Sequence, residues 1–149
     1  QLDDGVLALR DVDDALLERA RASMDETTFR RAAHVVAENA RPQSLARALA
    51  ANDLAAAGQV MAESHASLRD LYEVSCLELD ALVGLSRAQR GCYGARLTGA
   101  GFGGCAIALA EAAQVPAFAR DVSIAYAAAT KLRTNIIVSR PCAGTRVLG

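Results

Sequence analysis

The sequence has few of the residues that build metal sites, disulfide frameworks or membrane spans. It contains four cysteines and two histidines in 149 residues, and no two cysteines form a C-x-x-C pair. With only two imidazoles no zinc-binding spacing arises, and we expect no metal site in this chain. No apolar run reaches about 18 residues, so no membrane span is predicted. A signal peptide and an N-x-[ST] acceptor are also lacking, which favours reduced thiols and a cytoplasmic protein.

A dominant charge of one sign is lacking too. The 16 cationic residues, of which only Lys131 is a lysine, nearly balance 17 acidic residues. The cations are scattered along the chain, so we interpret them as solvated helix faces. A strongly basic surface is thereby excluded, and we expect no nucleic-acid partner. Hydrophobic residues, in contrast, make up 52% of the chain, which is enough for one compact domain over residues 1–149.

The first half of the sequence is typical of consecutive helices. Asp13 is placed to cap a first helix, and a second helix is expected to begin near residues 25–28. Pro42 lies inside this second helix, where it removes a backbone donor and crowds the preceding turn. We therefore expect a kink or break near Arg41. Asn52 and Asp53 form a turn and an N-cap before a third helix, whose apolar stripe extends to Leu68.

The second half mixes strands with helices. The Ser75-x-x-Glu78 pattern is a capping box and predicts a fourth helix that ends before Gly91. Pro116 suits the first turn of a fifth helix. Strands are expected at 94–98, 105–110, 135–139 and 145–148, the last two joined by a turn. Helices followed by the order β, β, α, β, β indicate an α+β sandwich.

The glycine-rich segment at 99–104 has three interpretations. Gly99, Gly101 and Gly104 match the dinucleotide pattern G-x-G-x-x-G, which requires a strand before it and a helix directly after it. We favour a loop of another kind, joining two antiparallel strands without a helix at 105–110. Its glycines then either permit positive φ in a hairpin or expose successive N–H groups as a concavity for phosphate. The residues alone leave these two roles equal.

Several segments resemble one enzyme family. Residues 94–105, Gly-Ala-Arg-Leu-Thr-Gly-Ala-Gly-Phe-Gly-Gly-Cys, resemble the third signature motif of galactokinases, within the GHMP small-molecule kinase superfamily. Galactokinase-like segments cover nearly the whole chain in the right order: residues 31–41, 63–70, 72–76, 78–83, 139–141 and 146–148. The run His-Ala-Ser-Leu-Arg-Asp at 65–70 resembles galactokinase-like members in particular. The family resemblance therefore does not depend on the glycine loop alone.

This resemblance implies transfer of a phosphoryl group from ATP to the anomeric hydroxyl of galactose, with Mg²⁺. It also implies a two-domain clamp whose C-terminal half is a ferredoxin-like antiparallel sheet packed against helices, with extra N-terminal helices. The glycine loop would lie at the cleft between the domains, beside the triphosphate. Carried over to this sequence, that role falls on Gly99, Gly101, Gly103 and Gly104.

The family's other motifs are not found in this sequence. Its sugar-recognition motif, its Gly-Leu-Ser-Ser-Ser phosphate loop and its catalytic Asp and Arg have no counterpart here. The resemblance thus implies that no catalytic residue lies in this chain, and that its partner is a catalytic N-terminal domain. We expect the chain alone to be inactive, and to expose an apolar patch that promotes self-association. Alternatives are a non-catalytic sugar and ATP sensor, a kinase for N-acetylgalactosamine or arabinose, or a stand-alone binding module.

Individual residues inside the match carry narrower expectations. Leu71, Leu77 and the pair Cys142-Ala143 depart from the family pattern, and Leu71 puts a polar role of its turn in doubt. The remaining expectations are structural rather than catalytic. We expect hydrogen-bonded imidazoles at His34 and His65, a small buried side chain at Cys105, an outward-facing Arg96, a packing role for Tyr72, and a turn held by Asp70 and Glu73.

Overall fold

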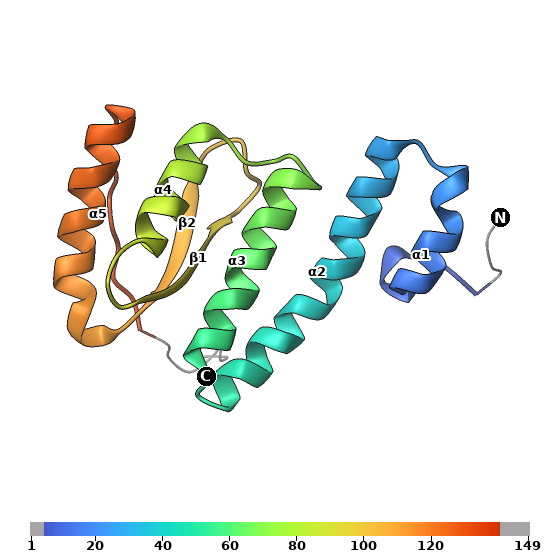
Figure 1. Ribbon diagram of the computed structural model, residues 1–149, viewed down its shortest axis with the longest axis horizontal. Helices are drawn as coiled ribbons and strands as arrows, with labels where there is room; N and C mark the ends of the chain where they lie inside the picture. The colour runs from blue at the N-terminus through green and yellow to red at the C-terminus, as the bar shows by residue number, and fades with distance from the viewer. Residues whose placement is uncertain (1–4, 141–149) are drawn as a thin grey trace, which may run out of the picture.

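The computed structural model describes residues 5–140, and within them the elements follow the order α1, α2, α3, α4, β1, β2, α5 (Figure 1). The bounds are α1 Asp14–Ala20, α2 Glu26–Ala50, α3 Leu54–Asp70, α4 Leu77–Arg87, β1 Cys92–Thr98, β2 Cys105–Ala110 and α5 Val115–Thr130. Short 3-10 turns occur at Leu9–Asp11, Arg21–Ser23 and Ala112–Gln114. The predicted α+β class is confirmed, with five helices and a two-stranded antiparallel sheet in this part of the chain.

Aspartate side chains begin the first three helices. Each accepts a hydrogen bond from the backbone N–H three residues later: Asp13 from Leu16 at 2.7 Å, Asp25 from Thr28 at 2.9 Å and Asp53 from Ala56 at 2.9 Å. These bonds satisfy donors that a helix leaves unpaired in its first turn. The start of α5 follows the other expected rule, with a proline in its first turn.

Of the kink or break predicted near Arg41, the break is wrong, because α2 continues through Pro42 from Glu26 to Ala50. The proline removes one N–H, which leaves the neighbouring hydrogen bonds of the helix in place. Helix α2 packs on α3. The side chain of Glu38 also accepts a hydrogen bond from Ser64 of α3 at 3.0 Å, one turn before Pro42. Packing thus outweighs the local preference.

The predicted capping box at the start of α4 is also wrong. The N-cap is Cys76, one residue later than expected, and its side chain makes no capping bond. The Ser75 hydroxyl instead donates to Asp80 Oδ1 at 2.5 Å. Asp80 lies on the first turns of α4, so the serine still stabilises the helix start, through a side chain rather than through the backbone. The predicted end before Gly91 is confirmed, since α4 ends at Arg87.

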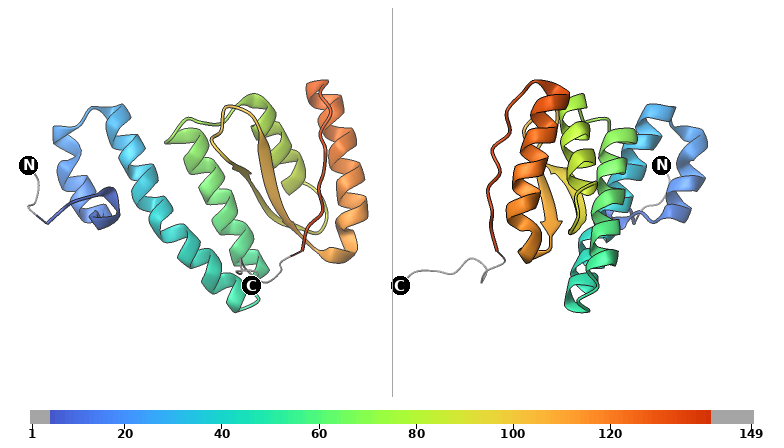
Figure 2. Two further views of the ribbon diagram at one scale, coloured as in Figure 1. Left: turned by 180° about the vertical axis from the view of Figure 1, so that it is seen from behind. Right: turned by 60° about the vertical axis from the view of Figure 1, so that its left-hand side comes forward.

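The elements lie side by side, from α5 at one end of the molecule to α1 at the other (Figure 1). Helix α4 packs on both strands, α3 packs on β1, and α2 packs on α3. Figure 2 shows that α1 and the start of α2 project away from the sheet. The buried apolar residues form one cluster between the sheet and its helices, Leu68, Val74, Leu79 and Leu97, and a second between α1 and α2, Leu17, Ala32 and Val36.

The two strands pair antiparallel, with Thr98 opposite Cys105 and Leu97 opposite Ala106. Helix α3 covers the edge of β1 that faces away from β2, where the N–H of Leu97 donates to Nδ1 of His65 at 3.4 Å. A strand edge that would otherwise expose an unpaired donor is closed by an imidazole. Within residues 5–140, no strand pairs with the opposite edge, along β2.

The strand predicted at 135–139 is wrong, because residues 132–140 form neither helix nor strand. Ile137 is 83% exposed and Val138 60% exposed, so the apolar run that suggested a buried strand lies on the surface. A strand requires a neighbour to satisfy its backbone groups, and no pairing partner for this segment is present within residues 5–140. The strand predicted at 145–148 lies outside the described residues.

Candidate functional site

The glycine loop, residues 99–104, is the turn of the β1–β2 hairpin, as predicted. Because β2 follows it directly, the helix that a dinucleotide-binding loop requires is not there, and that interpretation is excluded. All four glycines have positive φ: 91° at Gly99, 82° at Gly101, 129° at Gly103 and 99° at Gly104. Other residues rarely adopt this backbone conformation, so the loop needs its glycines for its shape.

Three of these glycines also leave the loop surface bare. A Cβ placed on Gly99, Gly103 or Gly104 would meet no other atom within 4 Å. Gly101 differs, since a Cβ there would overlap the carbonyl oxygen of Val74. The loop therefore has one face packed against the protein and an outer rim where backbone, rather than side chains, meets the surroundings. Bare backbone of this kind suits close approach by an anion.

A cavity of about 390 Å³ lies beside the loop. It is lined by side chains of α4 and α5 and by the loop itself: Cys76, Glu78, Leu79, Leu82, Phe102, Gly103, Gly104, Tyr126 and Leu132. Hydrogen bonds from its own backbone N–H and from the Cys76 thiol lower the pKa of Glu78, which keeps its carboxylate charged. With a carboxylate and no Arg or Lys in its lining, the cavity disfavours phosphate. Gly103 and Gly104 belong both to this lining and to the bare rim, whereas Gly99 is not among the lining residues.

The packed face of the loop is held by the turn between α3 and α4, residues 71–76. The N–H of Phe102 donates to the carbonyl oxygen of Val74 at 2.7 Å, and the N–H of Val74 donates to Leu68 of α3 at 3.0 Å. Phe102 has a φ of 59° and is 74% exposed. The loop thus projects an aromatic side chain from a backbone position that is anchored to the end of α3.

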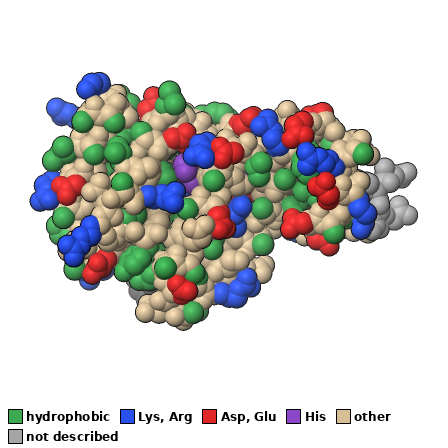
Figure 3. Space-filling view, in the orientation of Figure 1, with side chains coloured by type: hydrophobic (Ala, Val, Ile, Leu, Met, Phe, Trp, Pro, Cys, Tyr) green, Lys and Arg blue, Asp and Glu red, His purple; other side chains and the backbone are tan. Residues whose placement is uncertain are grey.

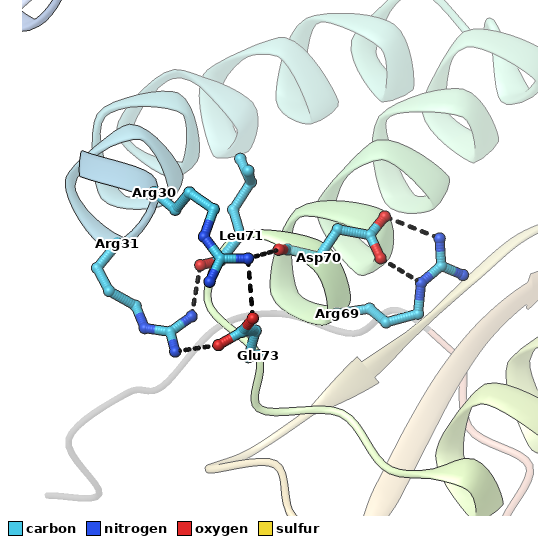
Figure 4. Close-up of polar contacts among 6 residues, drawn as sticks. All are labelled: Arg30, Arg31, Arg69, Asp70, Leu71 and Glu73. Carbon is cyan, nitrogen blue, oxygen red and sulfur yellow. Dashed lines mark hydrogen bonds and ion pairs between the residues drawn. The ribbon is translucent and has the colours of Figure 1, made fainter. Parts of the chain in front are cut away.

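Two arginines of α2, Arg30 and Arg31, bind this same turn (Figure 4). Their contacts with Glu73 and with the turn backbone are called the arginine clasp below. Arg31 donates to the Leu71 carbonyl and to the Glu73 carboxylate, both at 2.5 Å. Arg30 lies 2.8 Å from the other Glu73 oxygen and donates to the Asp70 carbonyl at 3.5 Å. Hydrogen bonding by Arg31, followed by the charges of both arginines, lowers the pKa of Glu73. The expectation that Glu73 holds the turn is confirmed, whereas the Asp70 carboxylate pairs with Arg69.

Both histidines are hydrogen-bonded, as predicted, and both are buried. Nδ1 of His34 lies 2.8 Å from the Ser67 hydroxyl, and its ring stacks on Tyr72 with centroids 4.5 Å apart. Nδ1 of His65 accepts from Leu97, and its Nε2 lies 3.4 Å from Asp80. Burial is the main cause that lowers the pKa of each imidazole. The two rings are therefore neutral structural links rather than bases facing the loop.

Two further expectations have different outcomes. Cys105 is exposed, so its predicted burial is wrong: it lies opposite Thr98, which is also exposed. Arg96 is partly exposed, as an outward position implies, but its guanidinium donates to the Leu97 carbonyl at 2.9 Å and lies 3.7 Å from Glu38 of α2. Arg96 is therefore committed to contacts away from the glycine loop.

A second cavity, of about 350 Å³, lies away from the glycine loop, between α2, α3 and the two strands. On the face shown in Figure 3, acidic and basic side chains are interspersed among the coloured residues, without a continuous patch of either sign. Within residues 5–140, no three His, Cys, Asp or Glu side chains form a group that could hold a metal ion. In the same part of the chain, every helix is too short or too polar to cross a membrane.

Comparison with known proteins identifies the family. Residues 45–128 match the family model described as GHMP kinases C terminal. The chain belongs to this family. The GHMP match includes all of α3 and α4, most of α5, and the whole hairpin with its glycine loop.

Relatives of this GHMP domain include galactokinases. The chain is 46% identical over 140 residues to a galactokinase of Roseiflexus sp. (strain RS-1), which covers 94% of this chain and 36% of that protein. It is 48% identical over 122 residues to the galactokinase of Homo sapiens, covering 82% of this chain and 31% of the relative. The chain thus spans about a third of the length of these curated relatives.

A solved structure shares the fold described above. It is the crystal structure of Lactococcus lactis galactokinase complexed with galactose, with a TM-score of 0.81 and 40% sequence identity. The match covers 86% of this chain and 33% of that one. The sequence resemblance to galactokinases is thereby confirmed, at the level of the C-terminal GHMP domain.

Proposed function

We propose that this chain is the C-terminal domain of a galactokinase, which uses ATP to convert galactose to galactose 1-phosphate. The observation that carries the proposal is the identity of 46–48% to galactokinases over 82–94% of this chain. We further propose that, in the whole protein, additional strands beside β2 complete a ferredoxin-like sheet. The TM-score of 0.81 to a galactokinase supports this architecture.

The glycine loop is the part of this domain that we assign to the nucleotide. Phosphoryl transfer depends on positioning and on stabilising charge, which backbone N–H groups supply without covalent chemistry. The bare outer rim at Gly99, Gly103 and Gly104 fits an approaching phosphate, whereas Gly101 holds the loop against Val74. We place the catalytic residues, the sugar-binding residues and the ligands of Mg²⁺ outside this chain, because their motifs are lacking from its sequence.

The decisive experiment uses the gene product from which this sequence comes. A coupled assay with ATP and Mg²⁺ is run on galactose, N-acetylgalactosamine and arabinose in parallel. We expect turnover with galactose at the highest kcat/KM. A higher kcat/KM with another sugar would identify that sugar as the substrate instead of galactose. Binding of galactose and ATP without turnover would indicate a non-catalytic sensor. An intact mass of 15.6 kDa for the native product would instead indicate a stand-alone module.

A further inference from the structure

Outside its own hairpin, the glycine loop is hydrogen-bonded to one peptide group, the one that carries the Val74 carbonyl. That oxygen accepts the Phe102 N–H at 2.7 Å, at the tip of the loop. The same oxygen lies where a Cβ of Gly101 would be, so the loop backbone rests directly on it. Val74 itself is 8% exposed and belongs to the central apolar cluster. The direction of its carbonyl therefore sets where the loop tip lies.

The direction of the Val74 carbonyl depends in turn on Glu73. Glu73 has a φ of 56°, in the left-handed region that residues with a side chain disfavour. Such a conformation persists only where surrounding contacts hold it. The Val74 N–H bond to Leu68 fixes one side of this turn. The left-handed backbone of Glu73 needs a second restraint. Glu73 directly precedes Val74, so its backbone conformation affects the direction of the Val74 carbonyl that the loop contacts.

That restraint comes from α2, about 40 residues earlier in the chain. Arg31 reaches the Leu71 carbonyl and the Glu73 carboxylate with one guanidinium, so it bridges the turn (Figure 4). Arg30 binds the remaining Glu73 oxygen at 2.8 Å. Both arginine side chains are 32% exposed and that of Glu73 is 44% exposed, so the arginine clasp is partly shielded from water. Two donors on one carboxylate fix its orientation better than a single point charge does.

We propose that Arg30 and Arg31 are positioning residues for the glycine loop. They hold Glu73 in its left-handed conformation, which directs the Val74 carbonyl at the Phe102 N–H and so fixes the loop rim. This inference rests on the proposed function for one consequence only, which is that a fixed rim binds the phosphates of ATP. The link from α2 to the loop tip stands on the contacts of this chain and has its own test.

The test of that link is amide hydrogen exchange of this chain, measured by NMR for Phe102 and for Leu97. Leu97 lies in β1 and is fully buried in the apolar cluster, so it reports general opening of the domain. We expect Arg31→Ala to speed exchange at Phe102 by about tenfold more than at Leu97. Arg31→Lys keeps the positive charge but loses the two-pronged guanidinium. Its exchange rate at Phe102 should therefore lie between those of Arg31→Ala and the unchanged protein. Arg120→Ala, which breaks the exposed Arg120–Asp121 pair, is the matched control and should leave Phe102 unchanged.

Equal acceleration at Phe102 and Leu97 would overturn the proposal, because the arginines would then serve general stability only. If Arg31→Ala fails to fold, Glu73→Gln removes the charge that both arginines bind, and it should give the same local acceleration. In the longer kinase, Arg31→Ala should raise KM for ATP by about fivefold or more and leave KM for galactose within about twofold. Faster exchange at Phe102 with an unchanged KM for ATP would reject the phosphate contact and still support the positioning role.

Discussion

Gly58 of α3 and Gly94 of β1 approach so closely that neither residue has room for a side chain. A Cβ on Gly58 would overlap the carbonyl oxygen of Tyr93, and one on Gly94 would lie 2.5 Å from the Cα of Gly58. Both glycines are buried. The helix therefore lies directly against the strand backbone, and this contact allows His65, two turns further along α3, to reach the N–H of Leu97.

Replacing Gly58 with alanine should destabilise the domain by about 1–3 kcal/mol, because the added methyl group forces α3 away from β1. The measurement is the free energy of unfolding from urea titration. Gly84→Ala is the matched control, since Gly84 is also helical but has no atom within 4 Å of a Cβ placed there. It should stabilise the domain by about 0.5–1 kcal/mol. Similar effects of the two substitutions would contradict the close contact.

Substitutions in the glycine loop should differ by position. Gly101→Ala combines an unfavourable positive φ with overlap of the Val74 carbonyl, whereas Gly99→Ala meets only the first penalty. We expect a loss of about 1 kcal/mol for Gly99→Ala and about 2–4 kcal/mol for Gly101→Ala. Urea unfolding measures both losses. Equal losses would show that the loop does not pack on Val74 in solution.

Acidification should weaken the fold through the two buried histidines. Burial lowers the pKa of His34 and of His65 from the usual 6.5, so the unfolded chain binds these protons at a higher pH than the folded domain. The free energy of unfolding should therefore fall as the pH drops below about 6.5, and these groups should add no pH dependence well above it. Urea midpoints at pH 7.5 and 5.5 measure the change. His34→Gln and His65→Gln should each reduce the difference between the two midpoints. A midpoint that rises on acidification would refute the prediction.

The chain alone should self-associate at high concentration. Leu77, Phe102 and Ile137 are 84%, 74% and 83% exposed, which is unusual for large apolar side chains in one domain. Light scattering coupled to gel filtration should give a mass above 15.6 kDa that increases with concentration. Ile137→Asp, in the segment that follows α5, should lower this mass, whereas Leu7→Asp, in the segment that precedes α1, should not. Helices α5 and α1 lie at opposite ends of the molecule (Figure 1). A strict monomer at every concentration would count against an apolar interaction surface.

The purified chain should not phosphorylate galactose. Positioning of the reactants supplies about 7–11 kcal/mol of such a barrier, and under the proposed function it requires residues outside this chain. The measurement is a coupled assay with galactose and Mg-ATP, run beside the longer protein. Turnover within about tenfold of the longer protein, a difference of about 1.4 kcal/mol in the barrier, would place the active site here after all.

The successful sequence predictions depend on short-range chemistry. Asp13 and Asp53 cap helices because an aspartate reaches the N–H three residues ahead of it, whatever the rest of the fold does. Pro116 suits a first helical turn for a similarly local reason. The hairpin around the glycine loop was predictable because positive φ at four positions is compatible with glycine and with little else.

The wrong predictions concern residues whose partners are distant in sequence, lacking within residues 5–140, or more than one. Pro42 remains helical in a helix that packs on α3, a contact that no pattern around the proline reveals. Ser75 has two possible partners within a few residues, and the Asp80 carboxylate is preferred over the backbone. The segment at 135–139 has strand composition but lacks a neighbouring strand within residues 5–140.

The candidate site likewise has a part that was predictable from neighbouring residues and a part that depends on distant ones. The glycines of the rim were identified from the sequence, since the loop motif is contiguous. Arg30, Arg31 and Val74 were not assigned to the site, because the arginine clasp joins residues about 40 positions apart and two adjacent arginines resemble a solvated helix face. The only local hint is Glu73, which follows Asp70 and Leu71 in a turn between two helices.

The closure of one sheet edge by α3 limits how copies of this chain could assemble. An exposed strand edge is a template for adding another strand, and chains with two such edges grow into open fibres. Here His65 and the rest of α3 block the edge of β1, and only β2 can accept a neighbour within the described residues. Two copies joined through β2 would carry α3 on both outer sides. Sheet extension would then stop at a twofold pair with no edge left to elongate.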